Sequence, residues 1–363
     1  MSEIRHNWTK EEILSIYNKP MMELLYEAAT IHRLHHDPNT VQVSTLLSIK
    51  TGGCPEDCGY CPQAARYHTD IEGNDLMSVQ HVKAQALRAK ASGSSRVCMG
   101  AAWRNVKDGP EFDDVLEMVR TINKLDMEVC CTLGMVTENQ AQRLAEAGLY
   151  AYNHNLDTSE DYYKDVISTR AFEDRLDTIS NVRKTNVTVC SGGIIGMGEA
   201  VQDRASMLVA LATLDPQPES VPINALVAVP GTPMEDIEPI SIWEMIRMVA
   251  TTRIVMPQTQ VRLSAGRTEM SREGQAMCFF AGANSIFAGD KLLTTPNPDV
   301  GEDMKMFELL GLNPQKPFVK KAQPETVEAV DSEYKSLGEK PKWTRPDHKI
   351  ERNEEAKLAG KSK

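Results

Sequence analysis

The pattern of apolar and polar positions divides the 363-residue chain into three parts. Up to about residue 40 the apolar positions recur with helical spacing. There Thr9 and Glu12 have the spacing of a capping box, and Pro20 precedes a second helical segment. From residue 41 short strand-like runs alternate with amphipathic stretches, and after residue 314 the character changes again. The pattern therefore predicts a helical extension (1–40), a central domain (41–314) and a C-terminal extension (315–363).

The central domain contains eight strand-like runs, and most intervals between them have helical spacing, as in 137–147, 170–184 and 242–254. Strands that alternate with helices are typical of parallel βαβ units. Eight such units in about 250 residues have the dimension of a (β/α)8 TIM-type barrel. We therefore expect an α/β barrel, with a doubly wound open sheet as the alternative. The strand-like runs are 43–49, 95–99, 128–133, 150–155, 188–195, 221–229, 261–265 and 285–288.

The C-terminal extension differs from the rest in composition. Nearly half of the residues after Tyr334 are charged, and few large apolar side chains are available for burial. A segment that buries little apolar surface cannot offset the conformational entropy lost on folding. We therefore expect most of 315–363 to be a disordered, solvated tail rather than a binding segment for an anionic partner.

Three histidines lie near the end of the second predicted helix. The i, i+3, i+4 spacing of His32, His35 and His36 places them on neighbouring positions of the helix surface, and such a set could bind a metal. Protonated imidazoles also interact favourably with the negative end of the helix dipole. We expect the histidines to act as helix-terminal cations rather than as metal ligands.

Composition and charge narrow the class of protein. No stretch approaches the roughly 20 apolar residues of a membrane span. The N-terminus lacks the apolar region of a secretory signal, so we expect a cytoplasmic protein with no membrane partner. The net charge of −11, with no long basic stripe before the extreme C-terminus, argues against a nucleic-acid partner. In a reducing compartment the eight cysteines must serve metal binding, catalysis or packing rather than disulfides.

The first cysteine group follows the first predicted strand. Cys54, Cys58 and Cys61 fall within eight residues of a loop rich in Gly and Pro, so the three thiols can converge on one site. Thiolates select iron–sulfur clusters or zinc. Structural zinc sites usually combine two CxxC-like pairs, and no second pair follows here. Three thiolates would leave one iron of a [4Fe–4S] cluster open, which favours a catalytic cluster.

A second cysteine group is distributed over three predicted strands. Cys98, Cys130 and Cys190 each lie within a different strand-like run, and alternate residues of barrel strands face the lumen. Each alone could be a buried apolar residue. However, Arg262 lies in the seventh run, and a buried guanidinium needs an anionic partner such as thiolates holding a cluster. Cys131 should face the opposite way from Cys130, although a one-residue slip in register would exchange the two.

The CxxxCxxC spacing, with Tyr60 before the last cysteine, resembles the radical S-adenosylmethionine superfamily. The resemblance implies that the open iron binds the amino and carboxylate groups of S-adenosylmethionine, and that an electron splits this molecule into methionine and a 5′-deoxyadenosyl radical. From about Trp8 to Pro314 the chain also resembles the biotin synthase family. The segments that carry this resemblance are STLLSIKTGGCPEDCGYCPQ, VCMGAAWRN, YNHNLDTS, VCSGGIIGMGE, ESVPINALV, VRLSAGR and AGANSIFAGDKLLTTPNP.

The resemblance implies a sulfurtransferase that converts dethiobiotin to biotin, taking sulfur from a second, [2Fe–2S] cluster. It implies two equivalents of S-adenosylmethionine for each biotin, because two unreactive C–H bonds must be broken. Polar residues at the end of the fourth predicted strand and within the sixth would contact the two small molecules. By the resemblance, the cluster ligands are Cys54, Cys58 and Cys61 for [4Fe–4S], and Cys98, Cys130, Cys190 and Arg262 for [2Fe–2S]; Tyr60, Asn155, Asp157 and Arg175 bind S-adenosylmethionine, and Asn155 and Asn224 bind dethiobiotin.

The same resemblance implies a homodimer and a small electron-donor protein, a flavodoxin or a ferredoxin. Two alternatives remain open. One is a different radical S-adenosylmethionine enzyme on the same barrel, which would need only the [4Fe–4S] cluster. The other is a zinc-binding protein without activity, in which the cysteines are structural. The second cysteine group with Arg262 separates the first expectation from the other radical S-adenosylmethionine enzyme, and a colourless, zinc-containing preparation would indicate the zinc-binding protein.

Overall fold

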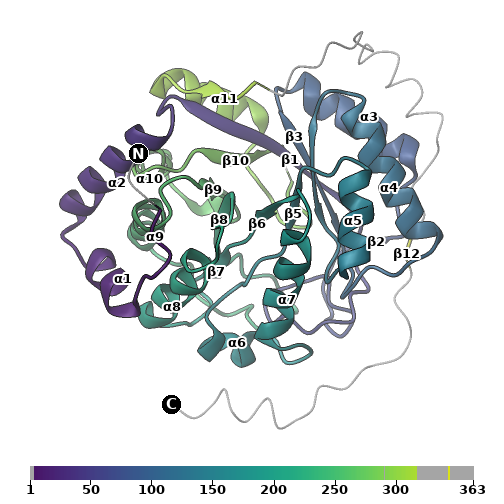
Figure 1. Ribbon diagram of the computed structural model, residues 1–363, viewed down its shortest axis with the longest axis horizontal. Helices are drawn as coiled ribbons and strands as arrows, with labels where there is room; N and C mark the ends of the chain where they lie inside the picture. Colours follow the sequence, from purple (N-terminus) through teal and green to yellow (C-terminus); the bar gives the residue numbers. More distant parts are fainter. Residues whose placement is uncertain (1–3, 290, 317–341, 344–363) are drawn as a thin grey trace.

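The computed structural model describes residues 4–289, 291–316 and 342–343 (Figure 1). Helices and strands alternate along most of it, which confirms the predicted α/β class. The helices are α1 (Lys10–Tyr17), α2 (Met21–His35), α3 (Val79–Ala91), α4 (Pro110–Asn123), α5 (Glu138–Glu146), α6 (Glu160–Val166), α7 (Phe172–Arg183), α8 (Val201–Ala212), α9 (Ile242–Val255), the 3-10 turn η1 (Arg267–Glu269), α10 (Arg272–Phe280) and α11 (Val300–Leu310). The strands are β1 (Thr40–Lys50), β2 (Gly73–Asn74), β3 (Arg96–Ala101), β4 (Glu128–Thr132), β5 (Ala151–Asn153), β6 (Thr188–Cys190), β7 (Gly193–Ile195), β8 (Ser220–Ala225), β9 (Gln260–Leu263), β10 (Ser285–Ala288), β11 (Asn313–Pro314) and β12 (Lys342–Trp343).

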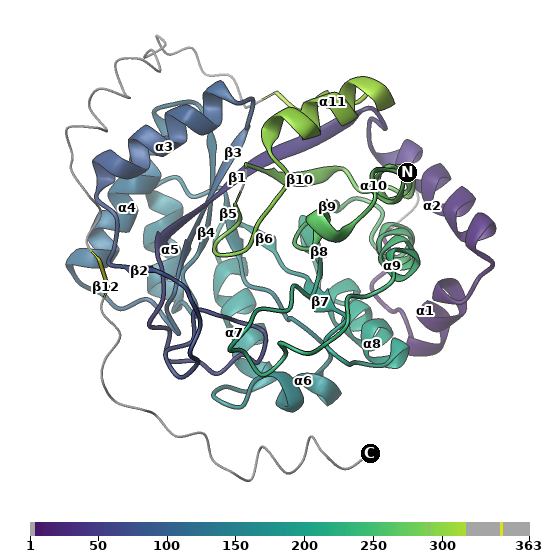
Figure 2. The same ribbon diagram turned by 180° about the vertical axis from the view of Figure 1, so that it is seen from behind.

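The main sheet is parallel and closes on itself. Its strands follow the order β1, β3, β4, β5, β6, β8, β9, β10, and β10 pairs with β1 in register from Gln42 opposite Ser285 to Thr45 opposite Ala288. The helices lie around the outside of this ring of strands in both views (Figures 1 and 2). The predicted (β/α)8 barrel is therefore confirmed, and the open-sheet alternative is excluded.

One predicted strand is divided in two. The run 188–195 forms β6 and β7, with Ser191 and Gly192 between them. A Cβ atom on Gly192 would lie 2.0 Å from the carbonyl oxygen of Pro222, so only glycine fits where β6 gives way to β7. The chain then pairs with β8 again, with Gly193 opposite Ile223. The run 221–229 also ends earlier than predicted, at Ala225.

The barrel separates two groups of buried side chains. Val97, Met99 and Cys131 belong to the large apolar core, which includes the helices packed around the sheet. Cys98 and Cys130 belong instead to a small cluster within the ring of strands, with Ala151, Phe287 and Leu292. Side chains of successive strand residues point to opposite faces, and this alternation explains the division. The prediction that Cys130 and Cys131 face opposite ways is confirmed, and Cys278 of α10 is also buried in the large core.

The N-terminal helices begin as their sequence indicates. The Thr9 hydroxyl accepts a hydrogen bond from the Glu12 N–H at 3.3 Å, and the Glu12 carboxylate accepts one from the Thr9 N–H at 3.0 Å.

The division into 1–40, 41–314 and 315–363 stays a prediction. Most of the last part lies outside the described residues, but Lys342–Trp343 pairs antiparallel with Gly73–Asn74.

For two of the three histidines at the end of α2, His32 and His36, the prediction of helix-terminal cations is wrong. His36 lies 2.8 Å from a guanidinium nitrogen of Arg253, and His32 stacks on His36 with 5.3 Å between the ring centroids. Burial, and then the charge of Arg253, lowers the pKa of His32 to about 3 and that of His36 to about 4. Both imidazoles are therefore neutral at physiological pH. The spacing placed them at a helix end but could not show that α9 covers this end.

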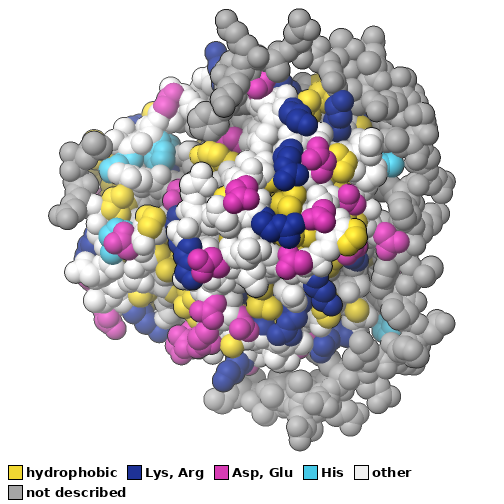
Figure 3. All heavy atoms as spheres, turned by 45° about the vertical axis from the view of Figure 1, so that its right-hand side comes forward, with side chains coloured by type: hydrophobic (Ala, Val, Ile, Leu, Met, Phe, Trp, Pro, Cys, Tyr) yellow, Lys and Arg dark blue, Asp and Glu magenta, His cyan; other side chains and the backbone are white. Residues whose placement is uncertain are grey.

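The face of the molecule drawn in Figure 3 is mixed in charge. Figure 3 shows Lys and Arg side chains interspersed with Asp and Glu side chains on one face of the molecule. Arg143 of α5, for example, forms ion pairs with Asp108 at 2.9 Å and Asp113 at 2.6 Å. Among the described residues, no helix has both the length and the apolar character needed to cross a membrane.

A buried ion pair joins the last helical unit to the barrel. Arg267, which follows β9, pairs with Asp303 of α11, and neither side chain is more than 1% exposed. Replacing Asp303 by Ala should lower the free energy of unfolding by about 3–5 kcal/mol, because it leaves a buried guanidinium without its anion. Chemical denaturation should show this loss. Glu302→Ala, at the exposed neighbouring position, should leave the free energy of unfolding nearly unchanged, and equal losses would contradict the assignment.

Candidate active site

A cavity of about 310 Å³ lies at the carboxyl ends of the barrel strands. This is the end of a (β/α)8 barrel where binding sites form. Its wall combines the 54–63 loop, the segments after β3, β4 and β5, the ends of β8 and β9, and residues 292–295 after β10. Both predicted cysteine groups contribute to it: Cys54, Cys58, Cys61, Cys98 and Cys130 line the cavity, together with Arg262.

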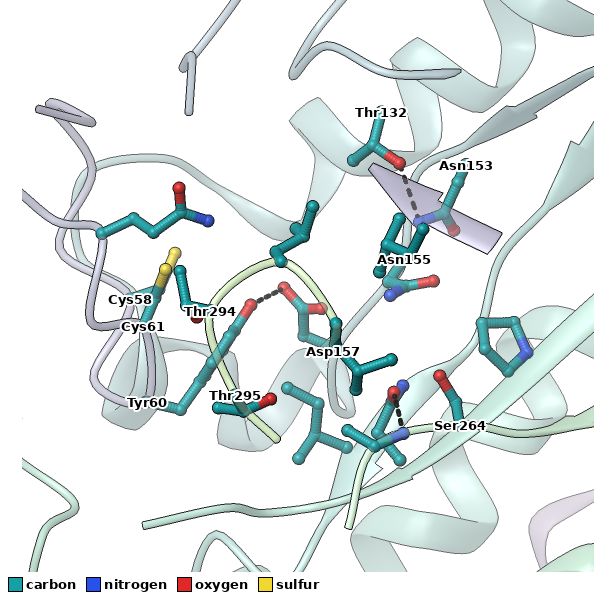
Figure 4. Close-up of a pocket in the computed structure, with 18 of the residues that line it drawn as sticks. Cys58, Tyr60, Cys61, Thr132, Asn153, Asn155, Asp157, Ser264, Thr294 and Thr295 are labelled. Atoms are coloured by element: carbon teal, nitrogen blue, oxygen red, sulfur yellow. Dashed lines mark hydrogen bonds between the residues drawn. The ribbon is translucent and has the colours of Figure 1, made fainter. Parts of the chain in front are cut away.

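The first cysteine group sits on a tightly folded loop. Gly52 and Gly53 both adopt positive φ, 77° and 72°, which turns the chain sharply after β1. The Cys54 N–H donates to the Gln63 carbonyl at 3.0 Å, so the loop returns on itself. Cys58 and Cys61 lie next to each other at the cavity wall (Figure 4). Burial raises the pKa of all three thiols, that of Cys58 to about 12, so deprotonation here would need a bound metal.

An acidic residue within the motif anchors this loop. The Asp57 carboxylate accepts hydrogen bonds from the backbone N–H groups of Ser168 at 2.9 Å and Thr169 at 3.1 Å, and also from both hydroxyls. Asp57 N–H donates in turn to the Thr169 hydroxyl at 3.2 Å. These bonds outweigh partial burial and lower the pKa of Asp57. The segment before α7 therefore fixes the cysteine loop in place.

The second cysteine group lies deeper within the barrel. Cys98 and Cys130 are direct neighbours in the register of β3 and β4, and their thiols hydrogen-bond each other. Cys190, at the end of β6, lies 4.0 Å from a guanidinium nitrogen of Arg262. The hydrogen bond from the Cys130 thiol, and then the charges of Arg262 and Arg96, lower the pKa of Cys98. The structure thus brings together the four residues predicted from separate strands.

Arg262 is a buried cation without an anionic protein partner in the described part of the chain. It is 1% exposed and donates to Ser285 at 2.9 Å, Gln42 at 3.1 Å and Ser44 at 3.4 Å, all neutral groups. A buried charge is costly unless an opposite charge compensates it. Three thiolates with an iron–sulfur cluster would supply that charge, so the donor set fits such a cluster.

The described residues contain no group of three or more His, Cys, Asp or Glu side chains arranged to hold a single metal ion. An iron–sulfur cluster is larger than one ion and brings its own sulfides, so its cysteines stand further apart. The fit to clusters rests on three observations: six free cysteines in two groups, at least five of them facing one cavity, and the uncompensated Arg262.

Next to the first cysteine group, the Asp157 carboxylate binds one aromatic and one basic side chain, and the basic side chain contacts a second aromatic residue. Tyr60 donates to Asp157 at 2.9 Å, as Figure 4 shows, and Arg175 forms a buried ion pair with the same oxygen. Arg175 Nε also donates to the Tyr163 hydroxyl at 2.8 Å. Asp157 has a φ of 69°, a left-handed conformation that Asp tolerates but that stores strain at the cavity.

The two predicted asparagines also hold the barrel wall together. Asn155 accepts the Gly192 N–H at 3.2 Å. Asn224 donates to the Gly193 carbonyl at 2.9 Å and accepts the Ala265 N–H at 3.1 Å. Both line the cavity, and an amide group has further donor and acceptor capacity for a ligand. Their orientation is thus fixed before anything binds.

Several cavity residues were not anticipated from the sequence. Glu56 lies within the cysteine motif but received no role, and it proves to be 2% exposed. Arg170 and His154 also line the cavity and are buried there. The position of Glu56 between Cys54 and Cys58 could have drawn attention to it, because a carboxylate that is buried there needs a compensating cation. Nothing in the local sequence indicated Arg170, since its environment is made by distant loops.

Asp57 offers a direct test of how the cysteine loop is held. Asp57→Ala should lower the free energy of unfolding by about 1.5–3 kcal/mol, because the charge-assisted hydrogen bonds to Ser168 and Thr169 are lost. Thermal or urea unfolding of the chain should show it. Asp108→Ala, which removes an exposed carboxylate paired with Arg143, should cost less than about 1 kcal/mol. If the two variants were equally stable, Asp57 would not anchor the loop.

The solved structures that resemble this chain have the same barrel. A methylornithine synthase superimposes with a TM-score of 0.71 at 16% identity, covering 85% of this chain and 94% of that chain. A maturase of the [FeFe]-hydrogenase gives a TM-score of 0.71 at 16% identity, covering 84% of this chain and 72% of that chain. At these identities the likeness establishes the fold alone.

Sequence comparison identifies the family. The Radical SAM superfamily model matches residues 48–210, and the Biotin and Thiamin Synthesis associated domain matches residues 222–313. A biotin synthase of Flavobacterium psychrophilum is 84% identical over the full length of both chains. Another, of Cytophaga hutchinsonii, is 63% identical over 88% of this chain and 94% of its own. The chain therefore belongs to the biotin synthase family of radical S-adenosylmethionine proteins.

Proposed function

We propose that this chain converts dethiobiotin to biotin by inserting sulfur with radicals made from S-adenosylmethionine. Family membership supports this function. The observation that carries it is the arrangement of two cysteine groups around a single cavity, with the uncompensated cation Arg262 beside the deeper group. A radical made at the first group would reach a substrate held between the two without leaving the cavity.

Two clusters would supply the reactive chemistry. Cys54, Cys58 and Cys61 would hold the [4Fe–4S] cluster, while Cys98, Cys130, Cys190 and Arg262 would hold the [2Fe–2S] cluster. When bound, the first provides the electron that cleaves S-adenosylmethionine, and the second provides the sulfur. Radical chemistry is required because hydrogens on methyl and methylene carbons are too weakly acidic for a general base.

The remaining site residues would bind and orient the two small molecules. The Asp157 carboxylate, fixed by Tyr60 and Arg175, would accept hydrogen bonds from the ribose hydroxyls of S-adenosylmethionine. Asn155 lies between this position and the barrel wall, so it can contact either molecule. Asn224 would bind the ureido ring of dethiobiotin, whose donors and acceptors match those of an amide. Preorganised side chains of this kind limit the motion of the reacting atoms.

Further features belong to this proposal. Each cleavage of S-adenosylmethionine consumes one electron, so the protein needs a small donor protein, a flavodoxin or a ferredoxin. We propose a homodimer on the resemblance to the family. A cytoplasmic location is supported by the cysteines, because all eight are free and such thiols persist in a reducing compartment.

Product analysis tests the proposed function directly. The anaerobically reconstituted protein, given dethiobiotin, S-adenosylmethionine and a reducing system, should yield biotin and about two 5′-deoxyadenosines for each biotin, because two C–H bonds are broken. Mass spectrometry measures both products. The proposal is falsified if 5′-deoxyadenosine forms but no sulfur enters dethiobiotin, which would favour a different radical S-adenosylmethionine enzyme.

Substitution of Cys98 in β3, compared with substitution of Cys131 in β4, tests the second cluster. Cys98→Ala should remove the [2Fe–2S] cluster, so that iron falls from about six to about four per chain, while the first cluster still binds S-adenosylmethionine. Cys131→Ala is the matched control, because Cys131 faces the helices and should leave both clusters intact. Iron and sulfide analysis with absorption spectra measures the outcome. Loss of both clusters in Cys98→Ala would show that the cysteines are divided wrongly.

A further inference from the structure

A buried ion pair lies at the amino end of the barrel, below the second cysteine group. Arg96 and Glu128 are the first residues of β3 and β4, and they lie opposite each other in the strand register. Nε and Nη2 of Arg96 both donate to Oε2 of Glu128, at 2.7 Å and 2.5 Å, and each side chain is only 4% exposed. The ring of Tyr150 stacks on the guanidinium, with 4.9 Å from its centroid to the guanidinium carbon. The proposed function leaves this pair without a role.

The pair lies one step along the strands from two of the cysteines. Each partner precedes a cysteine by two residues, so the charged side chains face the lumen as the thiols do. Residues two apart along a strand are separated by about 6.6 Å. The charge of Arg96 acts on all three thiols of the second cysteine group. Arg96 is therefore a second guanidinium beside this group, in addition to Arg262.

The two guanidinium groups differ in what balances them. Arg262 has only neutral partners among the described residues, so its charge faces the thiols undiminished. The charge of Arg96 is cancelled by Glu128, which is itself close enough to act on Cys98. A buried ion pair adds little net stability, because the cost of desolvation offsets the attraction. An apolar pair would fill the same space, but only a charged pair gives a balance that the loss of one partner upsets.

We propose that the Arg96–Glu128 pair sets the reduction potential of the second cluster, with Glu128 withholding the charge of Arg96 from it. This inference rests on the proposed function, because it requires a cluster at the second cysteine group. A reduced cluster carries one more negative charge than an oxidised one, so a positive charge nearby favours reduction. By cancelling that charge, Glu128 favours the oxidised cluster. Both residues act through the cluster, so their effect is measured from its potential.

The test measures the reduction potentials of both clusters in the reconstituted holoenzyme, by anaerobic redox titration followed by absorption and electron paramagnetic resonance. Glu128→Gln should raise the potential of the second cluster by about 60–120 mV, a tenfold to hundredfold change in the equilibrium constant for one-electron reduction. That is the effect of a unit charge about 7 Å away at an effective dielectric constant of about 20. The potential of the first cluster should change much less, because its loop lies at the opposite, carboxyl end of the strands.

Two further variants separate charge from packing. The double variant Arg96→Met/Glu128→Leu removes both charges and keeps the net charge, so its second cluster should have a reduction equilibrium within about threefold of the unaltered one. Glu219→Gln is the matched control. Glu219 also lies at the amino end of the barrel, directly before β8, but it pairs with Arg183 and its side chain is 41% exposed. Water screens this charge, so neither potential should move.

If Glu128→Gln fails to hold its second cluster, Arg96→Gln replaces it in the same titration. The potential should then fall by a similar amount, because an uncompensated carboxylate lies beside the thiols. Loss of the second cluster from both single variants but not from the double variant would support the inference, since only the single variants are unbalanced.

An unchanged potential in the single variant that holds the cluster would overturn the inference, as would an equal shift in the double variant. Loss of the second cluster from the single and double variants alike would also overturn it and would leave the pair with a packing role. If the unaltered protein held only the first cluster, the proposed function itself would be wrong.

Discussion

Hydrogen bonding between β1 and β10 closes the sheet, and every feature of the cavity depends on that closure. A closed parallel sheet gives each strand one face toward the lumen and one toward the helices. Cys98, Cys130 and Arg262 come from positions 164 residues apart along the chain, yet they face one enclosed volume. Their outward neighbours, such as Val97 and Cys131, complete the packing of the helices. The alternation of side chains along each strand therefore both packs the helices against the sheet and brings the thiols together in the lumen.

Positive charge is the second property that the barrel imposes on the cavity. Arg175 is balanced by Asp157, and Arg96 by Glu128 at 2.5 Å. Arg262 has only neutral partners among the described residues, and Arg170 shares one carboxylate with Arg104. A low-dielectric interior makes such imbalance costly, and anionic ligands relieve it. The two unbalanced guanidinium groups lie beside the two cysteine groups, so the excess positive charge is next to the thiols.

The segment 168–170 holds the cysteine loop and leads directly into the helix that carries Arg175. Ser168 and Thr169 hold Asp57 of the cysteine loop, and Arg170 faces Glu56 of the same loop. Directly after them α7 begins, and it carries Arg175, which orients Asp157. The loop that presents three thiols and the carboxylate that would bind ribose are thus fixed by one continuous stretch of backbone. Rigid mutual placement of this kind is what a reaction with a short-lived radical requires.

The sequence by itself determined the order of strands and helices, the two cysteine groups and the family, because periodicity, capping residues and local motifs are encoded by neighbouring residues. It also indicated that Cys98, Cys130, Cys190 and Arg262 meet, since lumen-facing positions follow from strand alternation once a barrel is assumed. Only the tertiary structure decided that Cys130 rather than Cys131 faces the lumen, and that α9 and Arg253 keep His32 and His36 neutral. The tertiary structure alone showed that Arg170 is buried in the cavity wall and shares the Glu56 carboxylate with Arg104. Burial and charge balance depend on contacts between distant segments, and those contacts have no signature in the local sequence.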